Sequence, residues 1–237
     1  MLGKALRLRR IFAQGRALIV DCDPCADDPL GKVRLLSRNG VDAIVLTPGL
    51  LDRVAEELAG LSVILRIDGG AWRGQHLVSV QAALEMGAEA VFVSVDVGRS
   101  GPSEALDRFG RITEDARRLG MPVFAEMASE DWLAAAHLGA DYGADVIQTR
   151  SHADTGGQRS FVRTTGMPLV VAPEESALRG PGVFQAIWEI MQGPAQGLTL
   201  FCAQALDQPD PGPMLQAVHA LVHQGVSVEE AAALARA

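Results

Sequence analysis

Short apolar runs rich in β-branched residues alternate with longer amphipathic stretches along the whole chain. The runs are too short for helices, and their continuous apolar character is typical of strands buried on both faces. The pattern therefore predicts eight strands, at residues 17–23, 42–46, 62–68, 90–95, 122–127, 144–148, 168–172 and 197–202.

The amphipathic stretches between these runs predict helices, and several end at a glycine. Glycine can take the left-handed conformation that closes a helix. Each predicted strand is thus followed by a helix, and eight such units in a chain of this length predict an α/β fold, the closed (β/α)8 or TIM barrel. An open doubly wound sheet is the alternative. Three predicted helices with their capping glycines are 32–39 before Gly40, 51–59 before Gly60 and 105–119 before Gly120.

The C-terminal part carries two further signals. Residues 209–213 are rich in proline and predict a rigid loop before the eighth helix, at 214–223. Ser227 and Glu230 then have the spacing of a capping box, which starts one more helix. We expect residues 1–237 to form a single TIM-barrel domain with a short N-terminal helix and an extra C-terminal helix.

Composition excludes several classes of function. The chain has 237 residues, 48% of them apolar, and a formal charge of −8. No stretch combines clustered Lys and Arg with aromatic residues, so nucleic acid is not an expected partner. Arginines interrupt the basic segment 1–14 before any apolar run reaches signal-peptide or membrane-span length. Three cysteines are too few for a disulfide framework. We expect a cytoplasmic protein that binds neither membrane nor nucleic acid.

Lysine is almost absent, and this restricts the chemistry. The only two lysines, Lys4 and Lys32, lie outside every predicted strand. An amine that condenses with a carbonyl group must be able to lose its proton, which arginine cannot do in a protein. The sequence therefore offers no strand-borne amine for imine catalysis.

Polar residues gather where the predicted strands end, which in a barrel is the mouth that carries active sites. Several carboxylates around one mouth raise some of their pKa values through repulsion and burial, and this favours proton transfer. Glu126 is our first candidate for a general acid or base. The candidates at strand ends are Asp21, Asp23, Asp68, Ser94, Asp96, Glu126, Gln148 and Arg150.

A structural interpretation of the same residues stays open. The carboxylates can pair with Arg66, Arg73 and Arg150 and hold the rim together without a chemical role. Asp68, which precedes two glycines, can be architectural.

Histidine and cysteine suggest two further kinds of site. His76 and His152 fall in predicted mouth loops, and His152 is the better candidate because it follows the sixth strand. Cys22 and Cys25, with Cys202 on the neighbouring eighth strand, could bind zinc, but the paired spacing of a structural zinc site is missing. A divalent cation could instead use the mouth aspartates. We expect no cofactor and no bound metal.

Five runs, in this order and spacing, resemble the DeoC/FbaB aldolase family. The resemblance is greatest to archaeal-type class I fructose-bisphosphate aldolases and to 2-amino-3,7-dideoxy-D-threo-hept-6-ulosonate synthases. It implies a TIM barrel, a carbonyl substrate and a homo-oligomer. The runs are ALIVDCD at 17–23, DAIVLTPG at 42–49, LRIDGG at 65–70, GADYGADVI at 139–147 and VHQGVSVEE at 222–230.

The catalytic positions implied by the resemblance are changed in this chain. Gln148 aligns with the family's Schiff-base lysine on the sixth strand. Asp23 matches the aspartate of an Asp-His pair, and Pro24 replaces the histidine. Ala128 aligns with an acid/base tyrosine. Gln148 can either orient a substrate carbonyl or simply fill the space of the lysine.

The phosphate site implied by the resemblance is also changed. The family has glycines and an arginine after the last two strands, where this chain places Glu174, Phe201 and Cys202. A carboxylate and an aromatic ring do not attract phosphate as glycine amides and arginine do. We therefore expect a substrate without phosphate, with Glu174, Cys202 and His152 among its contacts.

Our leading hypothesis is an aldolase-lineage enzyme that works without lysine. It would catalyse a lyase, aldol-type or cyclisation reaction on a non-phosphorylated carbonyl compound, in specialised biosynthesis. Asp23 and Glu126 would move protons, while Gln148 and Arg150 would polarise a carbonyl or hold a carboxylate.

Two alternatives remain. A non-catalytic paralogue would serve as a binding or assembly partner, with the mouth plugged by side chains such as Phe201, Met127 and Trp132. An imine enzyme would have to bring Lys32 inward from the first turn after strand one.

Overall fold

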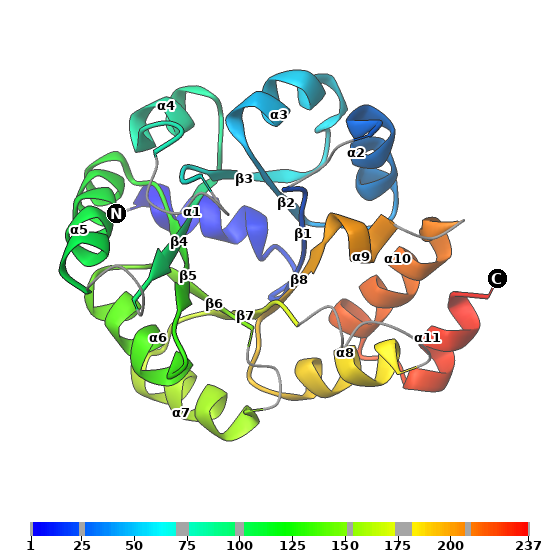
Figure 1. The fold of residues 1–237 in the computed structure, drawn as a ribbon. Helices are drawn as coiled ribbons and strands as arrows, with labels where there is room; N and C mark the ends of the chain where they lie inside the picture. The colour runs from blue at the N-terminus through cyan, green and yellow to red at the C-terminus, as the bar shows by residue number, and fades with distance from the viewer. Residues whose placement is uncertain are drawn as a thin grey trace.

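Eight parallel strands form a closed barrel in the computed structural model, which describes residues 2–23, 27–69, 76–97, 102–150, 154–173, 182–206 and 210–236. The strands pair in chain order, and β8 closes the ring by pairing with β1 (Figure 1). The TIM-barrel prediction is confirmed, and the open-sheet alternative is wrong. The strands are β1 (Ala17–Asp21), β2 (Ala43–Leu46), β3 (Ser62–Arg66), β4 (Ala90–Asp96), β5 (Val123–Ala128), β6 (Val146–Thr149), β7 (Leu169–Val171) and β8 (Gly197–Phe201).

Helices surround the barrel, as the amphipathic stretches predicted (Figure 1). Gly40, Gly60 and Gly120 have φ values of 78°, 87° and 66°, which confirms their left-handed conformation. None of the described helices is both long and apolar enough to cross a membrane. The helices are α1 (Leu2–Ile11), α2 (Pro29–Arg38), α3 (Pro48–Val54), η1 (Ala55–Glu57), α4 (Val80–Glu85), α5 (Pro102–Leu119), α6 (Trp132–Asp141), α7 (Thr155–Thr165), α8 (Val183–Gln192), α9 (Cys202–Leu206), α10 (Pro211–His219), η3 (Ala220–Gln224) and α11 (Val228–Leu234).

The region after β8 differs from its prediction. The strand ends at Phe201, and Cys202 begins the short helix α9, which the sequence did not indicate. The predicted loop at 209–213 is wrong from Pro211 onward, because α10 begins there. Proline fits the first turn of a helix, where its missing N–H needs no partner. The predicted capping box is confirmed: Ser227 and Glu230 each accept a hydrogen bond from the other's backbone N–H at the start of α11.

Helix α1 closes the N-terminal end of the barrel. Ile11, Leu8 and Phe12 pack against the apolar side chains that strands point into the barrel, and the Phe12 ring stacks on Phe124 at 6.2 Å. Lys4 Nζ donates to Asp145 Oδ2 at 2.6 Å, just before β6. Figure 1 shows α1 lying across the ring of strands. The barrel interior is therefore apolar and covered at this end, which leaves the opposite end for a site.

Candidate functional site

Strand alternation places a set of polar side chains inside the barrel at its C-terminal end. Ile19 of β1, Ile64 of β3 and Phe92 of β4 belong to the apolar interior. Because side chains two apart on a strand share a face, Asp21, Arg66 and Ser94 continue the same inward rows. Glu126 and Gln148 follow Phe124 and Val146 in the same way on β5 and β6. The sequence prediction of a polar mouth is thus confirmed for these positions.

Arg66 is the centre of this mouth. Its Nη2 donates to Asp21 Oδ2 at 2.6 Å, its Nε lies 3.3 Å from Asp23 Oδ2, and its Nη1 lies 3.6 Å from Asp68 Oδ1. The guanidinium rests on the Phe92 ring, 4.5 Å from the ring centroid. Its side chain is only 6% exposed. The structure therefore supports the ion-pair interpretation for Asp21 and Asp68, which hold Arg66 in place.

Asp23 differs from the other two partners of Arg66 because solvent reaches it. Its side chain is 30% exposed, whereas that of Asp21 is 1% exposed. Its backbone N–H donates to Asp21 Oδ1 at 3.1 Å, which fixes its place at the end of β1. Asp23 is therefore the carboxylate of this group that a substrate can approach.

Burial changes the protonation of Asp21. Loss of hydration raises the pKa of Asp21 to about 6, although Arg66 acts in the opposite direction and Asp23 and Glu126 add repulsion. The expectation that crowding and burial raise a carboxylate pKa is confirmed for this residue. The mouth therefore changes its charge near pH 6.

Glu126 connects Arg66 to Arg150 through a chain of contacts. Arg66 Nη1 donates a hydrogen bond to the Ser94 hydroxyl oxygen at 3.3 Å. The Ser94 hydroxyl in turn donates to Glu126 Oε2 at 3.3 Å. Arg150 Nε donates to Glu126 Oε1 at 2.7 Å, and its guanidinium lies 5.0 Å from the Phe201 ring centroid. Asp68 Oδ2 accepts from the Ser94 backbone N–H at 2.6 Å. One network thus joins the candidate acid/base groups to both arginines.

Gln148 is held by a residue that the sequence analysis missed. The Thr199 hydroxyl, on β8, donates to Gln148 Oε1 at 2.8 Å, and both side chains are buried. This occupies the carboxamide oxygen and leaves the NH2 group as the end that can donate. The available signal was Thr199 itself, a hydroxyl in an inward row of the eighth strand.

Neither lysine belongs to the mouth. Lys4 is paired with Asp145 at the opposite end of the barrel. Lys32 lies on α2, and its Nζ is 3.9 Å from Asp27 Oδ2. The prediction that no lysine lies on a strand is confirmed, and the structure does not show the inward Lys32 of the imine alternative.

Four further predicted site residues are Cys202, Asp96, His152 and Glu174. Cys202 is 4% exposed and packs in the apolar layer between barrel and helices, and its substrate contact stays a prediction. Asp96 ends β4, two residues beyond Ser94 on the same face. His152 and Glu174 lie outside the described residues, as do Pro24, Cys25 and Arg73.

Two of the three side chains predicted as an apolar plug, Met127 and Trp132, make other contacts in the described part of the chain. Met127 belongs to the layer outside the barrel, and Trp132 Nε1 donates to Asp154 Oδ2 at 3.1 Å. Phe201 is half-buried beside Arg150. Over the described ranges, no group of three or more His, Cys, Asp or Glu side chains is arranged to hold a metal ion.

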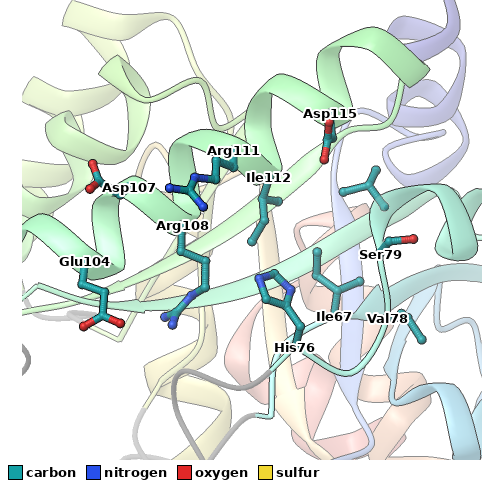
Figure 2. A pocket seen from close by; sticks show the side chains of 11 residues that line it. Ile67, His76, Val78, Ser79, Glu104, Asp107, Arg108, Arg111, Ile112 and Asp115 are labelled. Carbon is teal, nitrogen blue, oxygen red and sulfur yellow. The ribbon is translucent and has the colours of Figure 1, made fainter.

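A separate cavity of about 560 Å³ lies between the segment before α4 and helix α5. His76, Arg108 and Arg111 contribute to its wall, and Figure 2 shows the two arginines on α5 above His76. None of the network residues lines it. His76 therefore lies in the wall of this cavity, and its backbone forms an isolated β-bridge with Asp68 of the carboxylate network.

Comparison with known proteins gives a consistent family. The profile of DeoC/LacD family aldolases matches residues 8–172. The 2-amino-3,7-dideoxy-D-threo-hept-6-ulosonate synthase of Halobacterium salinarum is 29% identical, over 99% of this chain and 96% of that protein. The 3-hydroxy-5-phosphonooxypentane-2,4-dione thiolase of Yersinia enterocolitica is 28% identical, over 80% of this chain and 69% of that protein.

Solved structures show the same fold. An archaeal fructose 1,6-bisphosphate aldolase superposes with a TM-score of 0.80 at 20% identity, over 94% of this chain and all of that one. Another structure of an archaeal fructose-1,6-bisphosphate aldolase, with its catalytic lysine bound to a carbinolamine intermediate, gives a TM-score of 0.79 at 19% identity, over 93% and 99% of the two chains.

Proposed function

The chain belongs to the DeoC/LacD family of aldolases and is an aldolase-like enzyme; on that premise, we propose that it catalyses carbon–carbon bond chemistry on a non-phosphorylated carbonyl compound without forming an imine. The reaction is a lyase, aldol-type or cyclisation step. Asp23 and Glu126 move protons, and Gln148 binds the carbonyl oxygen.

One observation carries this proposal: the mouth offers an amide where the family resemblance places a lysine. Gln148 lies in the interior row of β6, and Thr199 fixes its oxygen. Both lysines of the chain are paired elsewhere, one of them at the far end of the barrel. An amide cannot condense with a ketone or an aldehyde, but its N–H can donate a hydrogen bond to the oxygen on which negative charge develops.

The proposed steps in the cleavage direction need only these groups. A carboxylate, Asp23 or Glu126, takes the proton of the substrate's β-hydroxyl group. The carbon–carbon bond breaks, the alkoxide carbon becomes a carbonyl, and the bonding electron pair forms an enolate on the other fragment. The Gln148 N–H stabilises the enolate oxygen, and the carboxylic acid that took the hydroxyl proton returns it to the enolate carbon, directly or through the other carboxylate.

The lack of phosphate on the substrate is supported by the residues at the ends of the last strands. Phe201 presents a ring at the end of β8, and Ala172 and Pro173 follow β7. The carboxylates around Arg66 also disfavour a dianion. We infer a setting in specialised biosynthesis and not in central sugar metabolism.

Proton exchange tests the proposal without knowledge of the full substrate. Hydroxyacetone, dihydroxyacetone and pyruvate are incubated with the protein in D2O, and deuterium incorporation beside the carbonyl is followed by ¹H NMR. We expect at least one probe to exchange faster than in buffer, and Asp23→Asn or Glu126→Gln to slow that exchange at least tenfold. Asp141→Asn, an exposed change on α6, serves as the control. Wild-type exchange at the buffer rate with every probe, or full activity in both variants, contradicts the proposal.

Borohydride trapping tests the absence of an imine. The wild-type protein, treated with these carbonyl probes and sodium borohydride, should show no covalent adduct by intact-mass measurement. Gln148→Lys places an amine at the same position and should give an adduct. A wild-type adduct on Lys32 would overturn the amide mechanism.

A further inference from the structure

Arg150 stands at the mouth as a guanidinium whose position is fixed while most of its donors are unused. Its Nε donates to Glu126 Oε1 at 2.7 Å, and the Phe201 ring lies beside its plane at 5.0 Å. Glu126 is itself held by the Ser94 hydroxyl at 3.3 Å. The side chain of Arg150 is nevertheless 52% exposed.

The two terminal nitrogens of Arg150 form the unused part. Across the described ranges they make no hydrogen bond, since the contacts of this side chain are those through Nε and the ring. Arg66 gives the contrast, because its terminal nitrogens already contact Asp21, Asp68 and Ser94. Of the two arginines in the described network, Arg150 is therefore the one that can receive a ligand.

We propose that Arg150 is a specificity-determining residue that binds the carboxylate of a 2-oxo acid substrate; this inference rests on the proposed function and specifies its substrate class. The free edge of a guanidinium matches a carboxylate with two parallel hydrogen bonds. Because Glu126 and Phe201 already restrict the side chain, less conformational entropy is lost on binding.

Charge favours a carboxylate over phosphate on this edge. The network contains four carboxylates, those of Asp21, Asp23, Asp68 and Glu126, against the two guanidiniums of Arg66 and Arg150. A second negative charge on the ligand therefore adds repulsion, and only one can be paired with the free edge of Arg150. A monoanion is the better match.

The position of Gln148 explains why the carbonyl should be next to the carboxylate. Gln148 lies on β6 and Arg150 is the first residue beyond its end, so the two residues are at most about 7 Å apart along the chain. Both side chains contact residues of the barrel mouth. In a 2-oxo acid the carboxylate is bonded directly to the carbonyl carbon. The carboxylate can then contact Arg150 while the neighbouring carbonyl oxygen accepts from the Gln148 NH2 group.

Binding of two matched probes tests the inference separately from catalysis. Pyruvate carries the carboxylate, and hydroxyacetone replaces it with a neutral hydroxymethyl group of similar size. Dissociation constants for both are measured by ligand-detected NMR titration with the wild-type protein. We expect pyruvate to bind more tightly than hydroxyacetone.

Variants at Arg150 identify the source of that preference. Arg150→Gln should weaken pyruvate binding by about ten- to a hundredfold, the effect of losing a charge-assisted pair of hydrogen bonds, and leave hydroxyacetone within about twofold. Arg150→Lys keeps the charge without the planar edge and should be intermediate. Arg163→Gln removes an exposed charge on α7 and should change neither probe. Retained hydroxyacetone binding shows that the variant's mouth is intact.

The two proposals fail in different ways. Equal affinity of wild type for both probes, no pyruvate binding at millimolar concentrations, or unchanged pyruvate binding in Arg150→Gln overturns the carboxylate assignment. If pyruvate binds through Arg150 but no probe exchanges deuterium, the assignment stands and the proposed catalysis fails. If only the neutral carbonyl probes exchange deuterium, the proposed catalysis stands and the carboxylate assignment fails.

Discussion

The two ends of the barrel use the same strands to make opposite environments. At the N-terminal end, inward side chains such as Ile19 and Phe124 pack with Ile11 and Phe12 around α1. At the C-terminal end, the next inward position of β1 is Asp21 and that of β5 is Glu126. These two carboxylates form ion pairs with arginines of neighbouring parts of the mouth. The covered end contributes stability through apolar burial. At the open end, ion-pair partners offset the free-energy cost of burying charged groups.

Removal of the central cation should be the most damaging single change at the open end. Arg66→Met leaves Asp21 and Asp68 buried without their counter-charge, so we expect a loss of about 3–5 kcal/mol in the free energy of unfolding. Urea denaturation measures this, and Arg53→Met, an exposed change on α3, should stay within about 0.5 kcal/mol. A loss below about 1 kcal/mol would mean that the carboxylates do not depend on Arg66.

The covered end should respond to a change in packing instead. Ile11→Ala removes a fully buried side chain between α1 and the strands and should cost about 2–5 kcal/mol. Leu2→Ala, on the same helix but 73% exposed, is the control and should have little effect. Measured at pH 5 and at pH 8, the cost should be the same, because no titrating group takes part. A cost that differs between these pH values would show that a titrating group also contributes to stability at the covered end.

The pH dependence of stability should come from Asp21. Its folded pKa of about 6 lies above the ordinary value of 3.8, so between these values the folded state holds a proton that the unfolded state releases. The contribution of Asp21 to the free energy of unfolding is fully present below about pH 4 and is lost as the pH rises to about 6. Relative to Asp21→Asn, the wild-type protein should therefore lose up to about 3 kcal/mol over this window.

Unfolding curves of the two proteins at intervals from pH 4 to pH 8 measure that difference. It should level off above pH 6 to 7, once Asp21 is ionised in both states. Asp141→Asn should run parallel to wild type throughout. A difference that grows in favour of the wild-type protein as pH rises would show that Arg66 outweighs burial at Asp21.

The smallest effect on stability is expected at Arg150. Arg150→Gln removes a half-exposed ion pair, which should cost less than about 1 kcal/mol in a urea titration. The same variant is expected to change pyruvate binding strongly, so stability and ligand binding should separate at this residue. Arg163→Gln provides the baseline for both measurements. Destabilisation comparable to that of Arg66→Met would place Arg150 among the structural arginines.

The fold could be predicted from the sequence because its signals are local. Continuous apolar runs such as ALIVD at Ala17–Asp21 and left-handed glycines such as Gly40 each depend on a few neighbouring residues. Helix α9 was missed because the apolar run of β8 continues into Cys202, and composition does not mark where a buried strand becomes a helix.

The site was only partly predictable, since its contacts join distant strands. Strand-end position was sufficient to identify Asp21, Asp23, Glu126 and Gln148 as residues of the mouth. It could not show which carboxylate pairs with which arginine, because those pairings depend on register and side-chain direction across the barrel. Thr199 is 51 residues from Gln148 in the chain, and only closure of the ring brings the two together.

The docking of α1 also has a consequence for how the protein is made. This helix leaves the ribosome before every strand, yet its Lys4 bonds to Asp145, 141 positions later in the chain. Helix α1 must therefore wait for β5 and the turn before β6 to emerge before it can pack in place, and until then its apolar side chains remain exposed. We expect α1 to be protected from hydrogen exchange late in folding, after the strands it covers have assembled.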